Sequence, residues 1–96
     1  MFIFNLTFIK PLTVVERTMD AHNAYLDQYY ADGTFLCSGG KVPRTGGIIL
    51  CRCASRQEAE EIMKQDPFYK EDIARYEIIE FTPSKSAEAL SKILLQ

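Results

Sequence analysis

Hydrophobic side chains in the first third of the chain follow two different spacings. In residues 2–9 they alternate, and the positions on one face are Phe2, Phe4, Leu6 and Phe8. From residue 15 onward one stripe advances by four, three, four and three residues, through Val15, Met19, His22, Leu26 and Tyr29, and all of its members except His22 are hydrophobic. A step of two is typical of a strand with one buried face, and steps of three and four are typical of a helix with one buried stripe. The pattern therefore predicts a strand followed by a helix.

Start and stop signals separate the remaining elements. Thr13 with Glu16 and Ser55 with Glu58 have the spacing of a capping box, which opens a helix. Gly33 after the first helix supplies a stop. The predicted elements are strand 2–9, helix 13–31, strand 34–39, loop 41–47, strand 48–54, helix 55–65, an irregular or single-turn connection 68–75, strand 76–82 and a helical tail within 84–96.

The order β-α-β-β-α-β predicts a ferredoxin-like α+β fold with both helices on one face of an antiparallel sheet. A chain of 96 residues fits a single domain, 1–96, in which residues 84–96 form a C-terminal helical extension. Strands 2–9 and 48–54 are apolar on both faces, so the uncovered sheet face would expose a large hydrophobic patch. We expect two sheets to pack face to face as a dimeric α/β barrel, in a homodimer or higher homo-oligomer. The alternative is that the C-terminal helix folds over its own sheet.

Composition narrows the possible partners. Apolar residues make up 47% and charged residues 25%, and the net charge of −2 with a pI near 5.3 gives no basic surface for nucleic acid or anionic membrane. No stretch of 18 apolar residues exists, and the N-terminal segment lacks the basic region of a signal peptide. The three cysteines are an odd number within predicted strands, which is typical of reduced thiols. The sequence therefore predicts a cytoplasmic protein without a membrane or nucleic-acid partner.

Two ionisable residues interrupt the apolar stripes of the predicted helices. His22, the only histidine, lies in the stripe between Met19 and Leu26, and Asp66 continues the stripe of Ile62 just after the end of the second helix. A base and an acid on inward-facing positions are candidates for a catalytic pair. Each residue also has a structural explanation that competes with the catalytic one. His22 could be a core histidine bonded to a backbone carbonyl or in a plain ion pair with Asp66, and Asp66 could be a helix-end cap.

Further residues could line a binding site for a small molecule. Ser38 and Gly39 end the second strand, where backbone amides could meet a substrate oxygen, although Gly39 could simply permit a turn. Arg44 in the following loop could bind a substrate carboxylate or be a solvated loop arginine. The aromatic side chains that could wall an aromatic-sized pocket are Tyr25, Phe68 and Tyr69, although Tyr25 and Phe68 could equally be ordinary core residues.

The sequence predicts neither a metal nor a cofactor. Cys51 and Cys53 flank Arg52 on a strand, and the lone histidine is distant in the sequence, so the ligand spacing of a zinc site is missing. The glycine-rich segments match neither the dinucleotide fingerprint nor the P-loop, and no nucleophile elbow is present.

Three segments together are similar to one known family. They are the H-x-x-x-L from His22 to Leu26, the strand Phe35-Leu36-Cys37-Ser38-Gly39 after the Gly33 turn, and Asp66-Pro67-Phe68. Residues 1–82 resemble the YCII-related (YciI-like) proteins in this order. The resemblance implies a ferredoxin-like protomer, a dimeric α/β barrel and a cleft in which His22 and Asp66 form a catalytic pair. The chain differs in having Gly39-Gly40 where family members usually have Gly-Pro, and in its residues 84–96.

The resemblance also suggests a type of chemistry. The family is related to muconolactone isomerase, and one branch resembles enzymes that remove chloride from chlorinated hydroxyhydroquinones. The leading hypothesis is a cofactor-independent lyase- or isomerase-like enzyme in which the His-Asp pair moves a proton on a small cyclic or aromatic-derived molecule. The competing hypotheses are a non-catalytic ligand-binding or accessory dimer module, and a purely structural dimer with a vestigial pocket.

Overall fold

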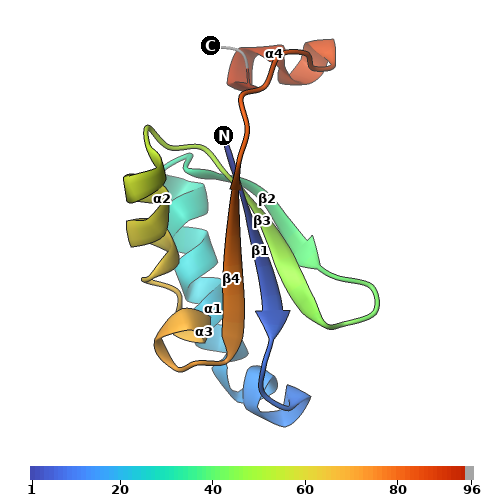
Figure 1. Cartoon of the computed structure of the whole chain (residues 1–96), viewed down its shortest axis with the longest axis vertical. Helices are drawn as coiled ribbons and strands as arrows, with labels where there is room; N and C mark the ends of the chain where they lie inside the picture. The colour runs from blue at the N-terminus through green and yellow to red at the C-terminus, as the bar shows by residue number, and fades with distance from the viewer. Residues whose placement is uncertain (95–96) are drawn as a thin grey trace.

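The chain alternates strands and helices in the predicted order. The computed structural model describes residues 1–94, and Figure 1 shows its elements coloured along the chain. They are β1 (Phe2–Phe8), α1 (Leu12–Ala31), β2 (Phe35–Gly40), β3 (Gly46–Cys51), α2 (Arg56–Met63), α3 (Pro67–Lys70), β4 (Ala74–Glu80) and α4 (Glu88–Leu94). The single turn of α3 falls in the predicted connection, and α4 lies within the predicted tail 84–96. The remainder of that tail, residues 95–96, lies outside the described residues.

The four strands form one sheet in the order β2-β3-β1-β4, and every neighbouring pair is antiparallel. α1, α2 and α3 lie on one side of this sheet, whereas α4 lies beyond its end (Figure 1). This arrangement is the α+β, ferredoxin-like fold that the sequence predicts.

The core lies between the helices and the covered face of the sheet. Phe4 is at its centre, opposite Ile49 on β3 and Ile78 on β4. Its ring is fully buried and packs edge-on against Phe35 and Tyr76. The other buried apolar residues are Phe2, Leu6, Val15, Tyr25, Phe35, Ile49, Cys51, Ala59, Ile62, Phe68, Ile73 and Ala74. The alternation of residues 2–9 therefore does place one face of β1 in the core.

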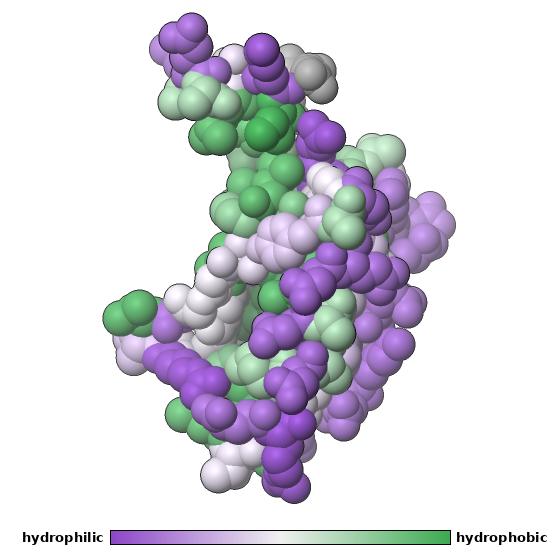
Figure 2. Space-filling model, turned by 180° about the vertical axis from the view of Figure 1, so that it is seen from behind, coloured by the Kyte–Doolittle hydropathy of each residue, from purple (hydrophilic) through white to green (hydrophobic). Residues whose placement is uncertain are grey.

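On the opposite face of the sheet, no helix within residues 1–94 packs across the strands. Ile3 pairs with Leu50 on β3 and Ile79 on β4, and all three side chains point away from the core. Ile48 and Ile79 remain 40% and 42% exposed. Figure 2 shows further apolar surface on α4 and on the segment below it, and the outline is hollowed between α4 and the rest of the molecule. The exposed patch expected from the sequence is present in the single chain.

The predicted signals at the second helix are confirmed. Ser55 Oγ accepts a hydrogen bond from the Glu58 amide at 3.1 Å, and the Glu58 carboxylate accepts one from the Ala54 amide at 3.1 Å. Gly33, with φ +81°, ends α1 in the left-handed conformation that favours glycine.

The capping box predicted at Thr13 is wrong. α1 begins one residue earlier, at Leu12, directly after Pro11, and no side chain caps it. Proline lacks an N–H and its fixed φ suits the start of a helix, so the chain can turn into α1 without a side-chain cap. Glu16 is consequently free of the helix start and pairs with Arg44.

The third and fourth strands are shifted towards the N-terminus relative to the predicted 48–54 and 76–82. β3 takes in two residues of the predicted loop 41–47, because Gly46 approaches β1 so closely that a Cβ atom there would lie 1.8 Å from the Leu6 carbonyl oxygen. The backbone pairing with β1 thus starts at a glycine that carries no hydrophobic signal. β4 begins at Ala74 because this small residue pairs with Phe8.

Candidate active site

His22 lies on the inward face of α1, in line with Val15, Thr18 and Tyr25, which are also buried. Only 9% of the residue is exposed. Its ring stacks on Phe68, with the ring centroids 4.0 Å apart and the planes tilted by 8°. The stack fixes the plane of the imidazole, so its two nitrogens point in defined directions.

Asp66 lies directly beside this ring. Its carboxylate is fully buried, and Oδ1 is 2.8 Å from His22 Nδ1. The same oxygen accepts a hydrogen bond from the Phe68 amide at 2.9 Å, so Asp66 also caps α3, with Pro67 at its first position. The cap at Asp66 and the ion pair with His22, the structural explanations considered from the sequence, occur together. When a carboxylate is ionised it only accepts hydrogen bonds, and in that form of Asp66 the bond is donated by Nδ1.

Tyr76 completes the surroundings of the carboxylate, and sequence reasoning missed this role. Its hydroxyl donates a hydrogen bond to Oδ2 of Asp66 from the inward face of β4. Burial, the nearby Asp66 charge and this hydrogen bond raise the pKa of Tyr76, so its hydroxyl remains a donor. The only signal in the sequence was its position on the inward face of the fourth strand.

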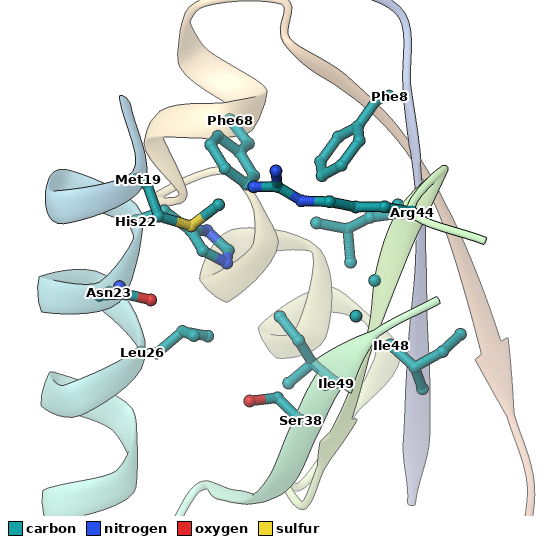
Figure 3. A pocket seen from close by; sticks show the side chains of 15 residues that line it. Phe8, Met19, His22, Asn23, Leu26, Ser38, Arg44, Ile48, Ile49 and Phe68 are labelled. Atoms are coloured by element: carbon teal, nitrogen blue, oxygen red, sulfur yellow. The ribbon is translucent and has the colours of Figure 1, made fainter. Parts of the chain in front are cut away.

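A pocket of about 240 Å³ lies on the other side of the His22 ring. Figure 3 shows α1 forming one wall and the β2–β3 hairpin the other. Its lining residues are Leu6, Phe8, Met19, His22, Asn23, Leu26, Ser38, Gly39, Gly40, Arg44, Gly46, Gly47, Ile48, Ile49 and Phe68. The register pairs Gly40 with Gly47 on the helix side of the hairpin. Because neither residue has a side chain, the space between hairpin and α1 stays open.

Four of the six residues predicted to line a binding site border this pocket together with His22: Ser38, Gly39, Arg44 and Phe68. Two of them already have partners: Ser38 Oγ is 2.5 Å from the Tyr30 hydroxyl, and Arg44 Nη1 is 2.5 Å from Glu16 Oε1. Gly39 contributes backbone, and Phe68 contributes the ring that supports His22.

The expectation that Tyr25 and Tyr69 also wall the pocket is wrong. The Tyr25 hydroxyl points into the core and donates a 2.8 Å hydrogen bond to the Ile62 carbonyl. Burial, followed by the Asp66 charge, raises the pKa of Tyr25, so this hydroxyl stays protonated. Tyr69 stays 39% exposed and packs edge-on against Tyr76.

Sequence reasoning also missed two residues of α1 in the pocket wall. Met19 and Asn23 lie one helical turn apart on the side of α1 that faces the hairpin, and both line the pocket (Figure 3). Their spacing relative to His22 and Leu26 was the available signal. Within residues 1–94, no three His, Cys, Asp or Glu side chains gather in a way that could hold a metal ion.

The chain combines a ferredoxin-like fold with a buried His22–Asp66 contact beside a small pocket, and the comparison with known families identifies the family it belongs to. The model of the YCII-related domain matches residues 1–82, and the chain belongs to this family. Residues 84–96 lie outside the match. No curated protein matches the chain significantly.

One solved structure with the same fold carries a ligand. It is 5-chloro-2-hydroxyhydroquinone dehydrochlorinase (TftG) of Burkholderia phenoliruptrix, in complex with 2,5-dihydroxybenzoquinone. It aligns with a TM-score of 0.70 at 20% identity, over 84% of this chain and 93% of the other. This similarity establishes the fold. None of the helices within residues 1–94 is both long and apolar enough to span a membrane.

Proposed function

We propose that this chain is a small cofactor-independent enzyme of the lyase or isomerase type, with His22 as the proton acceptor and donor. The observation that carries the proposal is the division of the imidazole between two environments. Nδ1 is bonded to the buried Asp66, whereas Nε2 has no hydrogen-bond partner within residues 1–94 and the ring lines the pocket. With Nδ1 protonated, Nε2 carries the lone pair, as a general base requires.

The proposed step is a proton transfer to Nε2 from a carbon or hydroxyl of a small cyclic molecule. In an elimination, the leaving anion departs with the electron pair of its bond; in an isomerisation, the proton returns to a different atom. Asp66 stabilises the imidazolium that forms between the two transfers. A positioned base of this kind contributes roughly 10²–10⁴-fold to the rate. The dehydrochlorinase with the same fold, which binds a quinone, supports this type of chemistry.

One observation favours the competing function, a ligand-binding module without turnover. Asp66 caps α3 and holds Tyr76 as well as His22, so the buried contact also serves the fold. A protein that only binds its ligand would need the pocket and this scaffold but no proton transfer.

The test is a two-stage experiment on one panel of small cyclic carboxylates and phenols. Ligands are first found by thermal stabilisation, and NMR in D₂O then measures deuterium exchange of their carbon-bound hydrogens. We expect His22→Ala to abolish the exchange while the fold and binding persist. Asn23→Ala, which changes a pocket residue one position away, should retain exchange. Exchange that survives in His22→Ala would disprove the role of His22, and binding without exchange would favour the ligand-binding module.

We further propose that two copies pair through the uncovered sheet face and form the dimeric barrel expected from the sequence. The half-exposed Ile48 and Ile79 support this assembly, since burying such a patch is favourable. Light scattering should report a dimer that Ile79→Glu converts to a monomer. Leu12→Glu changes a similarly exposed residue at the start of α1 and should leave the dimer intact. A monomeric unsubstituted protein at micromolar concentration would contradict the assembly.

A cytoplasmic location remains part of the proposal. Cys37, Cys51 and Cys53 are all unpaired thiols in the structure. Reduced cysteines are typical of the cytoplasm, which supports this location. Fractionation of the native cell would test it.

A further inference from the structure

The charge of the pocket comes from one side chain. Among the pocket residues within 1–94, Arg44 carries the only permanent charge, and none carries a carboxylate. The whole chain has a net charge of −2, so the positive charge in the pocket is a local feature. A pocket with a fixed cation and apolar walls favours a ligand that is partly apolar and partly anionic.

Arg44 reaches across this pocket. Figure 3 shows its side chain extending from the hairpin side towards Phe68 and Met19, above His22. Nη1 pairs with Glu16 of α1 at 2.5 Å, so the ion pair connects the two walls of the pocket. The two side chains are 45% and 60% exposed, and exposed ion pairs contribute little stability. The guanidinium can therefore leave Glu16 for a better partner at low cost.

The remaining pocket surface fits a single ring. A cavity of about 150 Å³ holds benzene, so about 240 Å³ accommodates a ring with one or two substituents. Phe8 and Phe68 supply aromatic walls, with their rings edge to face at a centroid distance of 5.7 Å. A guanidinium offers two parallel N–H donors that match the two oxygens of a carboxylate.

We propose that the pocket binds a small ring bearing a carboxylate, and that on binding Arg44 exchanges the Glu16 carboxylate for that of the ligand. This inference rests on the proposed function, because it names the substrate class of the same site. Glu16 competes for Arg44 and holds the guanidinium over the pocket until a ligand carboxylate takes its place. A neutral ring has no means of displacing Glu16 and binds only through its apolar contacts.

The test uses equilibrium binding of benzoate and of its neutral counterpart benzamide to the full chain, followed by NMR. Benzoate should bind at least tenfold more tightly than benzamide, and Arg44→Gln should remove this preference. Glu16→Gln should strengthen benzoate binding about two- to fivefold, the range expected for removing an exposed ion pair. The matched control is Arg17→Gln, which removes an exposed arginine on α1 outside the pocket and should change nothing.

Three results would overturn the inference: equal binding of benzoate and benzamide, no binding of benzoate at millimolar concentration, or weaker benzoate binding in Glu16→Gln. The binding experiment tests this inference separately from the proposed function, because it measures affinity and does not require turnover. A preference for benzoate without any deuterium exchange would support the carboxylate site and contradict proton transfer by His22. Deuterium exchange on phenols without any preference for benzoate would support proton transfer by His22 and contradict the carboxylate site.

Discussion

The two sides of the His22 ring differ in almost every physical respect. On the side facing α3, Asp66 is fully buried and bonded to His22, the Phe68 amide and Tyr76. On the side facing the hairpin, an open pocket is bordered by glycines and by the half-exposed Arg44. The first side holds Nδ1 in place, and on the second side the His22 residue lines the pocket. A proton-transfer site needs both, because the base must be fixed in direction and open to its substrate.

Mutations on the two sides of the ring should therefore have different effects. Substitutions on the α3 side should mainly reduce stability, and substitutions on the hairpin side should mainly alter binding. The following substitutions are ordered by their expected effect on the free energy of unfolding.

Asp66→Ala should cost most, about 3 kcal/mol, because it leaves the Phe68 amide and the Tyr76 hydroxyl as buried donors without acceptors. Urea denaturation measures this loss. Asp27→Ala, on the exposed side of α1, should stay within about 0.5 kcal/mol of the unsubstituted protein. A small loss for Asp66→Ala would mean that the α3 side is not the rigid half of the site.

Tyr76→Phe should cost about 1.5 kcal/mol, since it removes one hydrogen bond to a charged group. If Tyr76 positions the pair through Asp66, kcat for any substrate found should fall while KM stays the same. The exposed Tyr69→Phe should change neither stability nor kcat. Equal effects of the two substitutions would show that the hydroxyl of Tyr76 has no positioning role.

The same tyrosine predicts a pH dependence. Its pKa is raised in the folded protein, mainly by burial and then by the Asp66 charge. Its contribution to stability is therefore complete below about pH 10, the ordinary tyrosine pKa, and decreases as the pH rises above that value. As the pH rises from neutral to above about 10, the free energy of unfolding should therefore fall less in Tyr76→Phe than in the unsubstituted protein. Identical alkaline profiles would contradict the raised pKa.

Gly40→Leu should change stability by less than about 1 kcal/mol, because a Cβ atom there would meet nothing closer than the Gly46 carbonyl oxygen at 3.9 Å. The new side chain points into the pocket and should abolish ligand binding, as followed by thermal stabilisation. Gly39→Leu places the same side chain on the opposite face of β2 and should keep binding. Binding that persists in Gly40→Leu would place the ligand elsewhere.

Glu16→Gln should have the smallest effect on stability, under about 0.5 kcal/mol, because both partners of its ion pair are largely exposed. Urea denaturation at low and high salt would measure this change in the free energy of unfolding. A loss above about 1 kcal/mol would show that the Arg44–Glu16 contact supports the fold, and would weaken the contrast between the two sides.

The periodic parts of the molecule could be predicted from the sequence. Alternation placed Phe2, Phe4 and Leu6 in the core, and the interrupted stripes identified His22 and Asp66 as unusual buried positions. These inferences succeed because burial of a regular element imposes its own period on the sequence. The element order then gave the fold class.

Features that depend on contacts between distant segments could not be predicted in this way. Tyr76 is 10 residues from Asp66 in the sequence, and only the packing of α3 against β4 brings its hydroxyl to the carboxylate. The Arg44–Glu16 pair joins positions 28 residues apart, from the hairpin and α1. The early start of β3 at Gly46 was missed because backbone pairing has no hydrophobic signature there.

The glycines of the hairpin divide it into locked and adjustable positions. Gly46 excludes every side chain, because even a methyl group would overlap the Leu6 carbonyl. At Gly40, in contrast, a Cβ atom would make only an ordinary contact, 3.9 Å from the Gly46 carbonyl oxygen. During evolution, substitutions at position 40 could therefore change the size of the binding site without disturbing the sheet. Any substitution at position 46 would disturb the pairing of β3 with β1 and would be eliminated.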